Sequence, residues 1–249
     1  MSTRIVLEIA VASVEDALAA ERGGADRLEL NAALALGGST PSLGTLIEVK
    51  QTVVLPVFVM VRPRPGGFCY SAADFRVVQR DIELSLAHGA DGIVFGVLTE
   101  DGRVDVPRCR ELIRQAGKSP VVFHRAFDVT PDPLAALEQL IDLGVRRVLT
   151  SGQEVSAYNG AATIAELIRR SAGRIEVLPA AGINRFTVAD VVARTGCDQV
   201  HTSLRGTRTD PSTTARPHIS FGGGGWQSED RYDATDPAAV AELRRRLDG

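Results

Sequence analysis

The stretch GADRLEL, residues 24–30, recurs in variant form three more times along the chain. The related stretches are GADGIVF at 89–95, GVRRVLT at 144–150 and GCDQVHT at 196–202. Each begins with a glycine that follows a helical pattern and continues into an apolar run. The glycine suits the left-handed position that ends a helix, and the run suits a buried strand. Successive copies lie roughly 50 to 65 residues apart, which fits two strand–helix units per repeat.

Four further apolar runs lie between these repeats and bring the number of predicted strands to eight. They are IVLEIA from Ile5, VFVMVR from Val57, VVFH from Val121 and IEVLPAAG from Ile175. Strands rich in Val, Ile and Leu that alternate with helices indicate a parallel sheet covered on both faces. We therefore predict an α/β fold, a single (βα)8 TIM barrel over residues 1–249. The alternative, a doubly wound open sheet, lacks its GxGxxG fingerprint after the first strand.

The starts of several predicted helices carry capping signals. Two serines stand three residues before an aspartate, the spacing of a capping box, and three polar residues directly precede a proline that suits the first helical position. These pairs are Ser13 with Asp16, Ser71 with Asp74, Thr40 with Pro41, Asp132 with Pro133 and Asp236 with Pro237.

One long stretch, residues 204–235, has no clear strand or helix pattern and is rich in Gly, Ser, Thr and Asp. It lies between the eighth strand and the last helix and contains GGGGW at 222–226. A loop of this length in a compact domain is usually a lid, a partner contact or disordered. Trp226 is equally compatible with anchoring an interface and with closing over a pocket.

The composition is that of an ordinary globular protein, with 44% hydrophobic and 24% charged residues. The 28 basic residues are dispersed among 31 acidic ones, so no nucleic-acid partner is expected. The beginning of the chain lacks the basic and apolar regions of a signal peptide, and no apolar run reaches the ~18 residues of a membrane span. These patterns predict a cytoplasmic protein that does not contact membranes.

Polar side chains end seven of the eight predicted strands, and in a barrel those ends meet at one face. The candidates for general acid–base catalysis are Glu8, Glu29, His124 and His201. The candidates for ligand binding are Asn31, Arg62, Arg64, Arg125, Asp128, Thr150, Ser151, Gly152, Gly182, Asn184 and Ser203. Charged groups are rarely buried unless they are paired. The charged residues of this set therefore either form ion pairs with one another or face a cavity that holds water or a ligand.

This ring predicts a site for a small anionic or polyhydroxylated molecule, with isomerase or lyase chemistry by proton transfer. Several alternatives stay open at this point. The charged residues can form a structural ion-pair network, the histidines can be satisfied core residues, and the glycines can be ordinary tight turns. A divalent metal held by Glu8, Glu29, His124 and Asp128 is a further alternative, since carboxylate and imidazole ligands suit Mn, Mg or Zn.

The few lysines and cysteines exclude some chemistry. Lys50 and Lys118 belong to the opposite, amino-terminal face of the predicted barrel, so a Schiff-base aldolase has no lysine to use. Cys109 is placed on a helix and Cys197 before the eighth strand. Cys69, in the loop after the third strand, is the one thiol expected near the barrel mouth, and it is a weak candidate for binding copper.

Several of these motifs together resemble the CutC copper-homeostasis family. The resemblance rests on LEI at 7–9, GADRLEL at 24–30, GGSTPS at 37–42, RPR at 62–64 with the nearby GGFCYS, FHRAFD at 123–128 and RVLTSGQ at 147–153. It covers about residues 5–205, and motifs of this length in this order are more specific than any single pattern.

The resemblance implies a cytosolic TIM barrel, often a homo-oligomer, with a part in copper handling and copper as a candidate ligand. It places the family's polar pocket at Glu8, Glu29, Arg62, Arg64, His124, Arg125, Asp128 and the Thr150-Ser151-Gly152 turn. Family members can carry cysteines just beyond the first-strand glutamate, where this chain has Ala10 and Val11. Copper(I) prefers thiolate and thioether ligands, and the cysteines and methionines of this chain do not converge on one predicted site.

Overall fold

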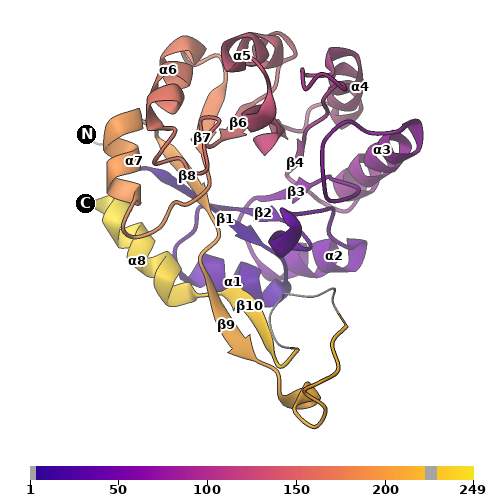
Figure 1. Cartoon of the computed structure of the whole chain (residues 1–249), viewed down its shortest axis with the longest axis vertical. Helices are drawn as coiled ribbons and strands as arrows, with labels where there is room; N and C mark the ends of the chain where they lie inside the picture. The colour runs from indigo at the N-terminus through magenta and orange to yellow at the C-terminus, as the bar shows by residue number, and fades with distance from the viewer. Residues whose placement is uncertain (1–3, 222–228) are drawn as a thin grey trace.

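The computed structural model describes residues 4–221 and 229–249 and contains a nearly closed barrel of eight parallel strands (Figure 1). The strands follow the order β7-β6-β5-β4-β3-β2-β1-β8. They are β1 (Val6–Val11), β2 (Arg27–Leu30), β3 (Val57–Met60), β4 (Gly92–Phe95), β5 (Val121–Phe123), β6 (Arg147–Thr150), β7 (Glu176–Pro179) and β8 (Gln199–Thr202). The predicted TIM-barrel fold and all eight predicted strands are confirmed.

Within the described residues, eight helices surround the barrel (Figure 1). They are α1 (Val14–Arg22), α2 (Leu43–Thr52), α3 (Ala72–Ala87), α4 (Val106–Ala116), α5 (Pro133–Asp142), α6 (Ala161–Ser171), α7 (Val188–Thr195) and α8 (Pro237–Asp248). Three short 3-10 turns complete the fold: η1 (Leu34–Leu36), η2 (Arg125–Val129) and η3 (Pro211–Thr213). In the part of the chain that the structure describes, no helix is long and apolar enough to cross a membrane.

The repeated glycines have the predicted backbone conformation. Gly24, Gly89, Gly144 and Gly196 have φ angles of 89°, 90°, 76° and 69°. A residue with a Cβ rarely adopts this left-handed region, which explains why glycine recurs between each of these helices and the strand that follows.

Four of the five predicted helix caps are confirmed. Ser13, Asp132 and Asp236 each accept a backbone N–H of the first turn, and Ser71 with Asp74 forms a complete capping box. The Thr40 cap was wrong, because α2 begins two residues later and is capped by Ser42. The Thr40 hydroxyl instead donates to Asp81 at 2.9 Å and accepts the backbone N–H of Arg62 at 3.1 Å.

Residues 204–235 are more regular than the sequence pattern indicated. β9 (Arg205–Thr209) and β10 (Arg231–Thr235) form an antiparallel pair that projects away from the barrel (Figure 1). The pair is anchored at its base, where the backbone N–H of Thr235 donates to the Asp16 carboxylate on α1 at 2.6 Å. Trp226 and the glycine run at 222–226 lie outside the described residues.

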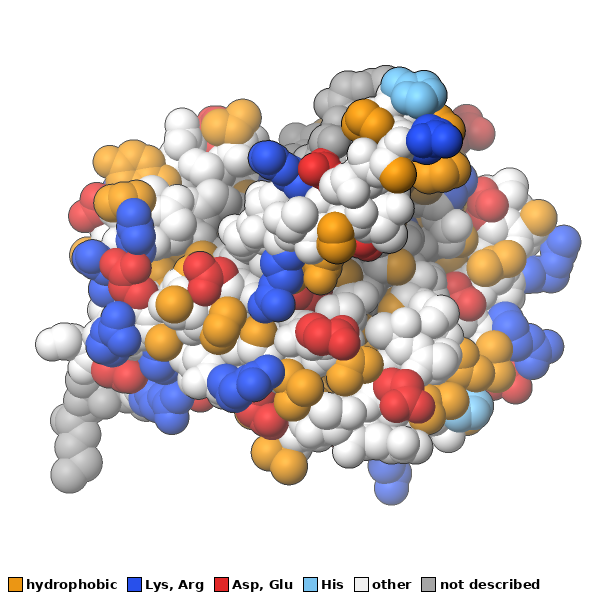
Figure 2. All heavy atoms as spheres, turned by 90° about the horizontal axis from the view of Figure 1, so that it is seen from below, with side chains coloured by type: hydrophobic (Ala, Val, Ile, Leu, Met, Phe, Trp, Pro, Cys, Tyr) orange, Lys and Arg blue, Asp and Glu red, His pale blue; other side chains and the backbone are white. Residues whose placement is uncertain are grey.

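The main apolar core lies between the strands and the surrounding helices, and smaller apolar clusters fill part of the barrel interior. On the molecular face shown in Figure 2, basic and acidic side chains are interspersed among hydrophobic ones. That face therefore carries no extended patch of one charge.

Candidate functional site

A cavity of about 760 Å³ opens at the carboxyl ends of the strands. Ten of the predicted site residues line it: Glu29, Asn31, Arg62, His124, Arg125, Asp128, Gly182, Asn184, His201 and Ser203. The remaining five, Glu8, Arg64, Thr150, Ser151 and Gly152, are not among the described residues that line it. The barrel thus brings most of the predicted ring into one hollow.

Glu8 lies one layer below the cavity. Strand β1 is paired so that Glu8 faces Arg27 of β2 and His201 of β8, while Ala10 pairs with Glu29 and lines the cavity. The Glu8 carboxylate pairs with the Arg27 guanidinium and accepts from Nδ1 of His201, with 2.7 Å between Nδ1 and Oε1. Glu8 is therefore linked to the cavity wall by its hydrogen bond to His201.

A belt of polar side chains crosses the barrel interior around Glu8. Gln199 accepts from Arg27 at 2.6 Å and from Arg147 at 3.0 Å, and Arg147 pairs with Glu176 at 2.6 Å. Sequence reasoning missed Arg27, Arg147 and Gln199. The signal that could have found Arg27 is its position two residues before Glu29, since residues two apart share a strand face.

Glu29 and His201 meet at the cavity wall. Both side chains are buried, and Nε2 of His201 lies 3.8 Å from Oε2 of Glu29. Asn31 donates to Oε2 of Glu29 at 2.8 Å. The other carboxylate oxygen, Oε1, is buried and has no hydrogen-bond partner among the described residues.

The charges in this cluster shift one another's pKa values. Burial opposes ionisation of Glu8, but Arg27 and His201 outweigh it and lower the pKa of this carboxyl. Burial raises the pKa of Glu29, with a further contribution from Glu8. Burial opposes the charged form of His201, yet the carboxylates of Glu29 and Glu8 raise its pKa overall. The cluster therefore favours an ionised Glu8 and a proton held near His201 and Glu29.

His124 follows β5 and packs closely on its neighbours. A Cβ at position 96 would lie 2.3 Å from Cε1 of His124, so Gly96 leaves the space that the imidazole occupies. Phe68 covers the imidazole, with ring centroids 4.9 Å apart. Burial, together with the charge of Arg62, lowers the pKa of His124 to about 3. With this pKa, the imidazole of His124 is neutral near pH 7.

Arg62 extends from the loop after β3 and organises the loops around it. Its Nη1 donates to the carbonyls of Leu36 at 3.2 Å and Gly38 at 2.8 Å, and its Nη2 donates to Gly66 at 2.7 Å. Arg64, predicted to share the same site, turns away from the cavity. It pairs with Asp74 at 3.1 Å and donates to the carbonyl of Cys69 at 3.0 Å.

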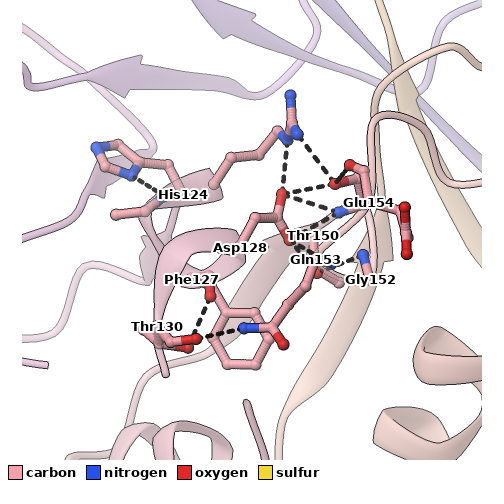
Figure 3. A network of polar contacts seen from close by, with 11 residues as sticks. His124, Phe127, Asp128, Thr130, Thr150, Gly152, Gln153 and Glu154 are labelled. Atoms are coloured by element: carbon pink, nitrogen blue, oxygen red, sulfur yellow. Dashed lines mark hydrogen bonds and ion pairs between the residues drawn. The ribbon is translucent and has the colours of Figure 1, made fainter. Parts of the chain in front are cut away.

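Asp128 lines the cavity and links η2 to the end of β6 (Figure 3). Its carboxylate accepts from the Thr150 hydroxyl at 2.5 Å, the backbone and hydroxyl of Ser151 at 3.0 Å and 2.9 Å, and the backbone of Gln153 at 3.3 Å. Arg125 pairs with it at 2.7 Å. Thr150 and Ser151 therefore hold Asp128 in place and do not themselves face the cavity.

Sequence reasoning also missed part of the cavity wall. These residues include Leu34, Met60, Phe68, Leu149, Leu204 and Arg205. Phe68 belongs to the quoted motif GGFCYS, which was the available signal. The leucines and Met60 gave no such signal, because leucine and methionine residues in apolar runs most often belong to the hydrophobic core.

The comparisons with known proteins agree with one another. The model of the CutC family matches residues 5–206. A CutC family protein from Treponema denticola is 50% identical over 243 residues, which cover 98% of this chain and 99% of that protein. The chain belongs to the CutC family. The copper homeostasis protein cutC homolog from Homo sapiens is 45% identical, over 96% of this chain and 87% of that one.

A solved structure supports the same assignment. The crystal structure of the copper homeostasis protein CutC from Streptococcus agalactiae matches with a TM-score of 0.77 and 30% sequence identity. It covers 80% of this chain and 98% of that one. The barrel described above is thus shared with a member of the CutC family.

The residues of this CutC family member do not fit a copper(I) thiolate site. Cys69 is exposed, whereas Cys109 and Cys197 are buried. Burial raises the pKa of the Cys109 thiol to about 12, which disfavours the thiolate that binds metal. In the described part of the chain, the one group of three potential ligands that converges is Glu8, Glu29 and His201. Oxygen and nitrogen donors of this kind suit divalent ions better than copper(I).

Proposed function

We propose that the cavity binds a small anionic or polyhydroxylated molecule and catalyses a proton transfer on it, as an isomerase or lyase does. The observation that carries this proposal is the buried Glu29 carboxyl. Its Oε1 lacks a partner among the described residues, and its Oε2 lies 3.8 Å from His201. A buried carboxyl at a cavity wall, with one oxygen that lacks a hydrogen-bond partner, is suited to exchanging a proton with a ligand.

The neighbours of Glu29 support acid–base chemistry. Its pKa is raised by burial, toward the range in which a carboxyl both accepts and returns a proton near neutral pH. His201 stands beside it with Nδ1 held by Glu8, which fixes the orientation of the imidazole and leaves Nε2 toward Glu29. In this arrangement Glu29 is the base, His201 the acid, and Glu8 positions His201.

The rest of the cavity wall supports the ligand class. Arg62 brings a positive charge, and Asn31, Asn184 and Ser203 bring amide and hydroxyl groups that bind hydroxylated molecules. Met60 and other apolar residues complete the wall. A pocket with few polar groups in an apolar wall is typical of small-molecule sites.

Solvent exchange tests the proposal. The protein would be incubated in D2O with a panel of small hydroxy acids, keto acids and sugar phosphates, and each carbon-bound proton followed by NMR. We expect at least one compound to exchange a proton for deuterium, and Glu29→Gln to slow that exchange at least 100-fold, because general bases contribute about 10² to 10⁴ in rate.

Glu15→Gln is the matched control, because Glu15 is exposed on α1 and is not among the described residues that line the cavity. It should leave the exchange rate unchanged. Exchange that continues undiminished in Glu29→Gln contradicts the proposal, as does a complete absence of exchange in the wild-type protein with every compound of the panel.

A second function, metal binding, is favoured by the convergence of Glu8, Glu29 and His201, whose donor atoms lie within 4.8 Å of one another. These residues would hold a divalent ion, which would supply Lewis-acid chemistry to a ligand in the cavity. Titration with Zn²⁺, Mn²⁺ and copper, followed by calorimetry, tests this function. Binding lost in His201→Ala supports it. Stoichiometric copper(I) binding that is lost in Cys69→Ala supports a copper site at the exposed thiol instead.

A further inference from the structure

His124 carries a buried hydrogen-bond donor at the wall of the cavity. Its Nδ1 accepts the backbone N–H of Ala126 at 3.1 Å, so Nδ1 carries a lone pair and the proton of the neutral ring sits on Nε2. The residue is 4% exposed and lines the cavity, and Nε2 has no hydrogen-bond partner among the described residues. A buried donor of this kind is costly unless a ligand or water accepts from it.

Arg62 presents a second donor and a charge that no carboxylate balances. Its two Nη atoms are used by three backbone carbonyls, while Nε is buried and unpartnered within the described chain. No carboxylate of residues 4–221 or 229–249 forms an ion pair with this guanidinium. Carbonyl dipoles orient the guanidinium, but they do not neutralise it, and a buried charge requires a counter-charge.

The two donors flank the same aromatic ring. The Cζ of Arg62 lies 5.2 Å from the centroid of Phe68, and the His124 ring lies 4.9 Å from it. All three side chains line the cavity. Glu29 lines the same cavity, so the two donors and the proposed base can contact the same ligand.

We propose that Nε–H of Arg62 and Nε2–H of His124 together bind an oxygen that carries or develops negative charge, and that the ligand is a small carboxylate or carbonyl compound. A neutral imidazole beside a cation is suited to this task, because it donates to an oxyanion without giving up its own proton. The assignment explains why His124 is held in one tautomer.

The chemistry that follows rests on the proposed function of Glu29. The Glu29 carboxylate takes a proton from the carbon next to the carbonyl, and the C–H electron pair forms a carbon–carbon double bond. The carbonyl π electrons move onto oxygen, which accepts hydrogen bonds from Arg62 and His124. The electrons return from oxygen as Glu29 gives a proton back to the same carbon, which restores the carbonyl and Glu29, so the step needs no oxidant, reductant or co-reactant.

Oxalate is the probe for the oxyanion pair, because its planar charged oxygens mimic an enolate. Calorimetry would compare wild type with two variants of His124. His124→Gln keeps an N–H near the Nε2 position, whereas His124→Asn keeps a polar group near Nδ1 and loses that donor. We expect oxalate affinity to fall tenfold or more in His124→Asn and less than about threefold in His124→Gln, as for the loss of one charge-assisted hydrogen bond.

A spectroscopic measurement is independent of affinity. In long-range ¹H–¹⁵N spectra, His124 should show the Nε2–H tautomer, with the signal assigned by its absence in His124→Asn. Oxalate should shift the Nε2–H resonance and slow its exchange with water. Thermal unfolding checks that both variants are folded.

The proposal is overturned if wild type fails to bind oxalate, if His124→Asn binds it as tightly as wild type, or if His124 carries its proton on Nδ1. Glu29→Gln separates this inference from the proposed function, because it should lose proton exchange and retain oxalate binding. Oxalate binding that depends on His124, in a protein without any exchange activity, would keep the oxyanion site and discard the catalysis.

Discussion

At the scale of single residues, two histidines that line one cavity have pKa values shifted in opposite directions. His201 lies between two carboxylates, which raise its pKa, whereas His124 lies beside Arg62 and in an apolar setting, where burial lowers its pKa to about 3. Both were predicted as acid–base groups from their positions at strand ends. Their pKa values shift in opposite directions because the charge of an imidazole depends on neighbours contributed by other strands.

The raised pKa of His201 predicts how stability depends on pH. Burial opposes the imidazolium, but Glu29 and Glu8 raise the pKa above its usual value of 6.5. A raised folded-state pKa stabilises the protein fully below 6.5, and this stabilisation is lost as the pH rises through the folded-state pKa. We expect wild type to lose more unfolding free energy between pH 6 and pH 9 than His201→Gln, measured by urea denaturation.

His88→Gln provides the control for this measurement, because His88 is exposed at the end of α3. It should follow the wild-type dependence on pH. Equal losses in wild type and His201→Gln would show that the imidazole of His201 does not carry the expected charge.

At the scale of elements, the turn η2 is joined to strand β6 by one carboxylate. Asp128 accepts hydrogen bonds from Thr150, Ser151 and Gln153 and pairs with Arg125, so it connects the segment after His124 to the next strand end (Figure 3). The sequence places these residues on neighbouring strands, and their spacing alone predicted a ligand-binding turn. In the structure Asp128 and Arg125 line the cavity, and Thr150 and Ser151 hold Asp128 in place.

Asp128→Asn should weaken this connection. The substitution replaces one acceptor oxygen by an NH2 group that faces donors of Ser151 and Thr150, which leaves buried donors unpaired. We expect the free energy of unfolding to fall by about 1–3 kcal/mol, measured by urea denaturation. Asp101→Asn is the matched control, since the Asp101 side chain is 62% exposed, and it should change stability far less. Equal effects of the two substitutions would mean that Asp128 is not a structural link.

At the scale of the whole molecule, the barrel is complete without the hairpin of β9 and β10, which projects from it (Figure 1). Ile219, Phe221 and Tyr232 on this segment are exposed by 45%, 81% and 50%. Large apolar side chains exposed on a projecting segment favour a contact with another molecule. We infer that the hairpin joins copies of this chain into a homo-oligomer.

Truncation of the hairpin tests this inference. Thr209 and Arg231 are antiparallel partners, so replacing residues 210–230 by Asn-Gly closes the strands with a two-residue turn. We expect light scattering after size-exclusion chromatography to give a smaller mass for the truncated protein, with the melting temperature of the barrel retained. An unchanged mass together with weaker oxalate binding would indicate a lid instead.

The sequence alone determined the barrel, because the relevant signals are local. Left-handed glycines, capping residues and apolar runs of strand length all lie within a few positions of one another, and their fourfold repetition allows few other folds. It also determined which residues end the strands. It could not determine which of these side chains line the cavity and which lie below it.

The tertiary structure decided the roles within the site, through strand register and loop packing. Pairing of Glu8 with Arg27 and His201, instead of with Glu29, sets Glu8 below the cavity. Arg64, in the loop after β3, pairs with Asp74, while Gly96 just after β4 makes room for His124 just after β5. These outcomes depend on contacts between residues far apart in the chain, and the periodicity of a single strand contains no information about the stagger of its neighbours.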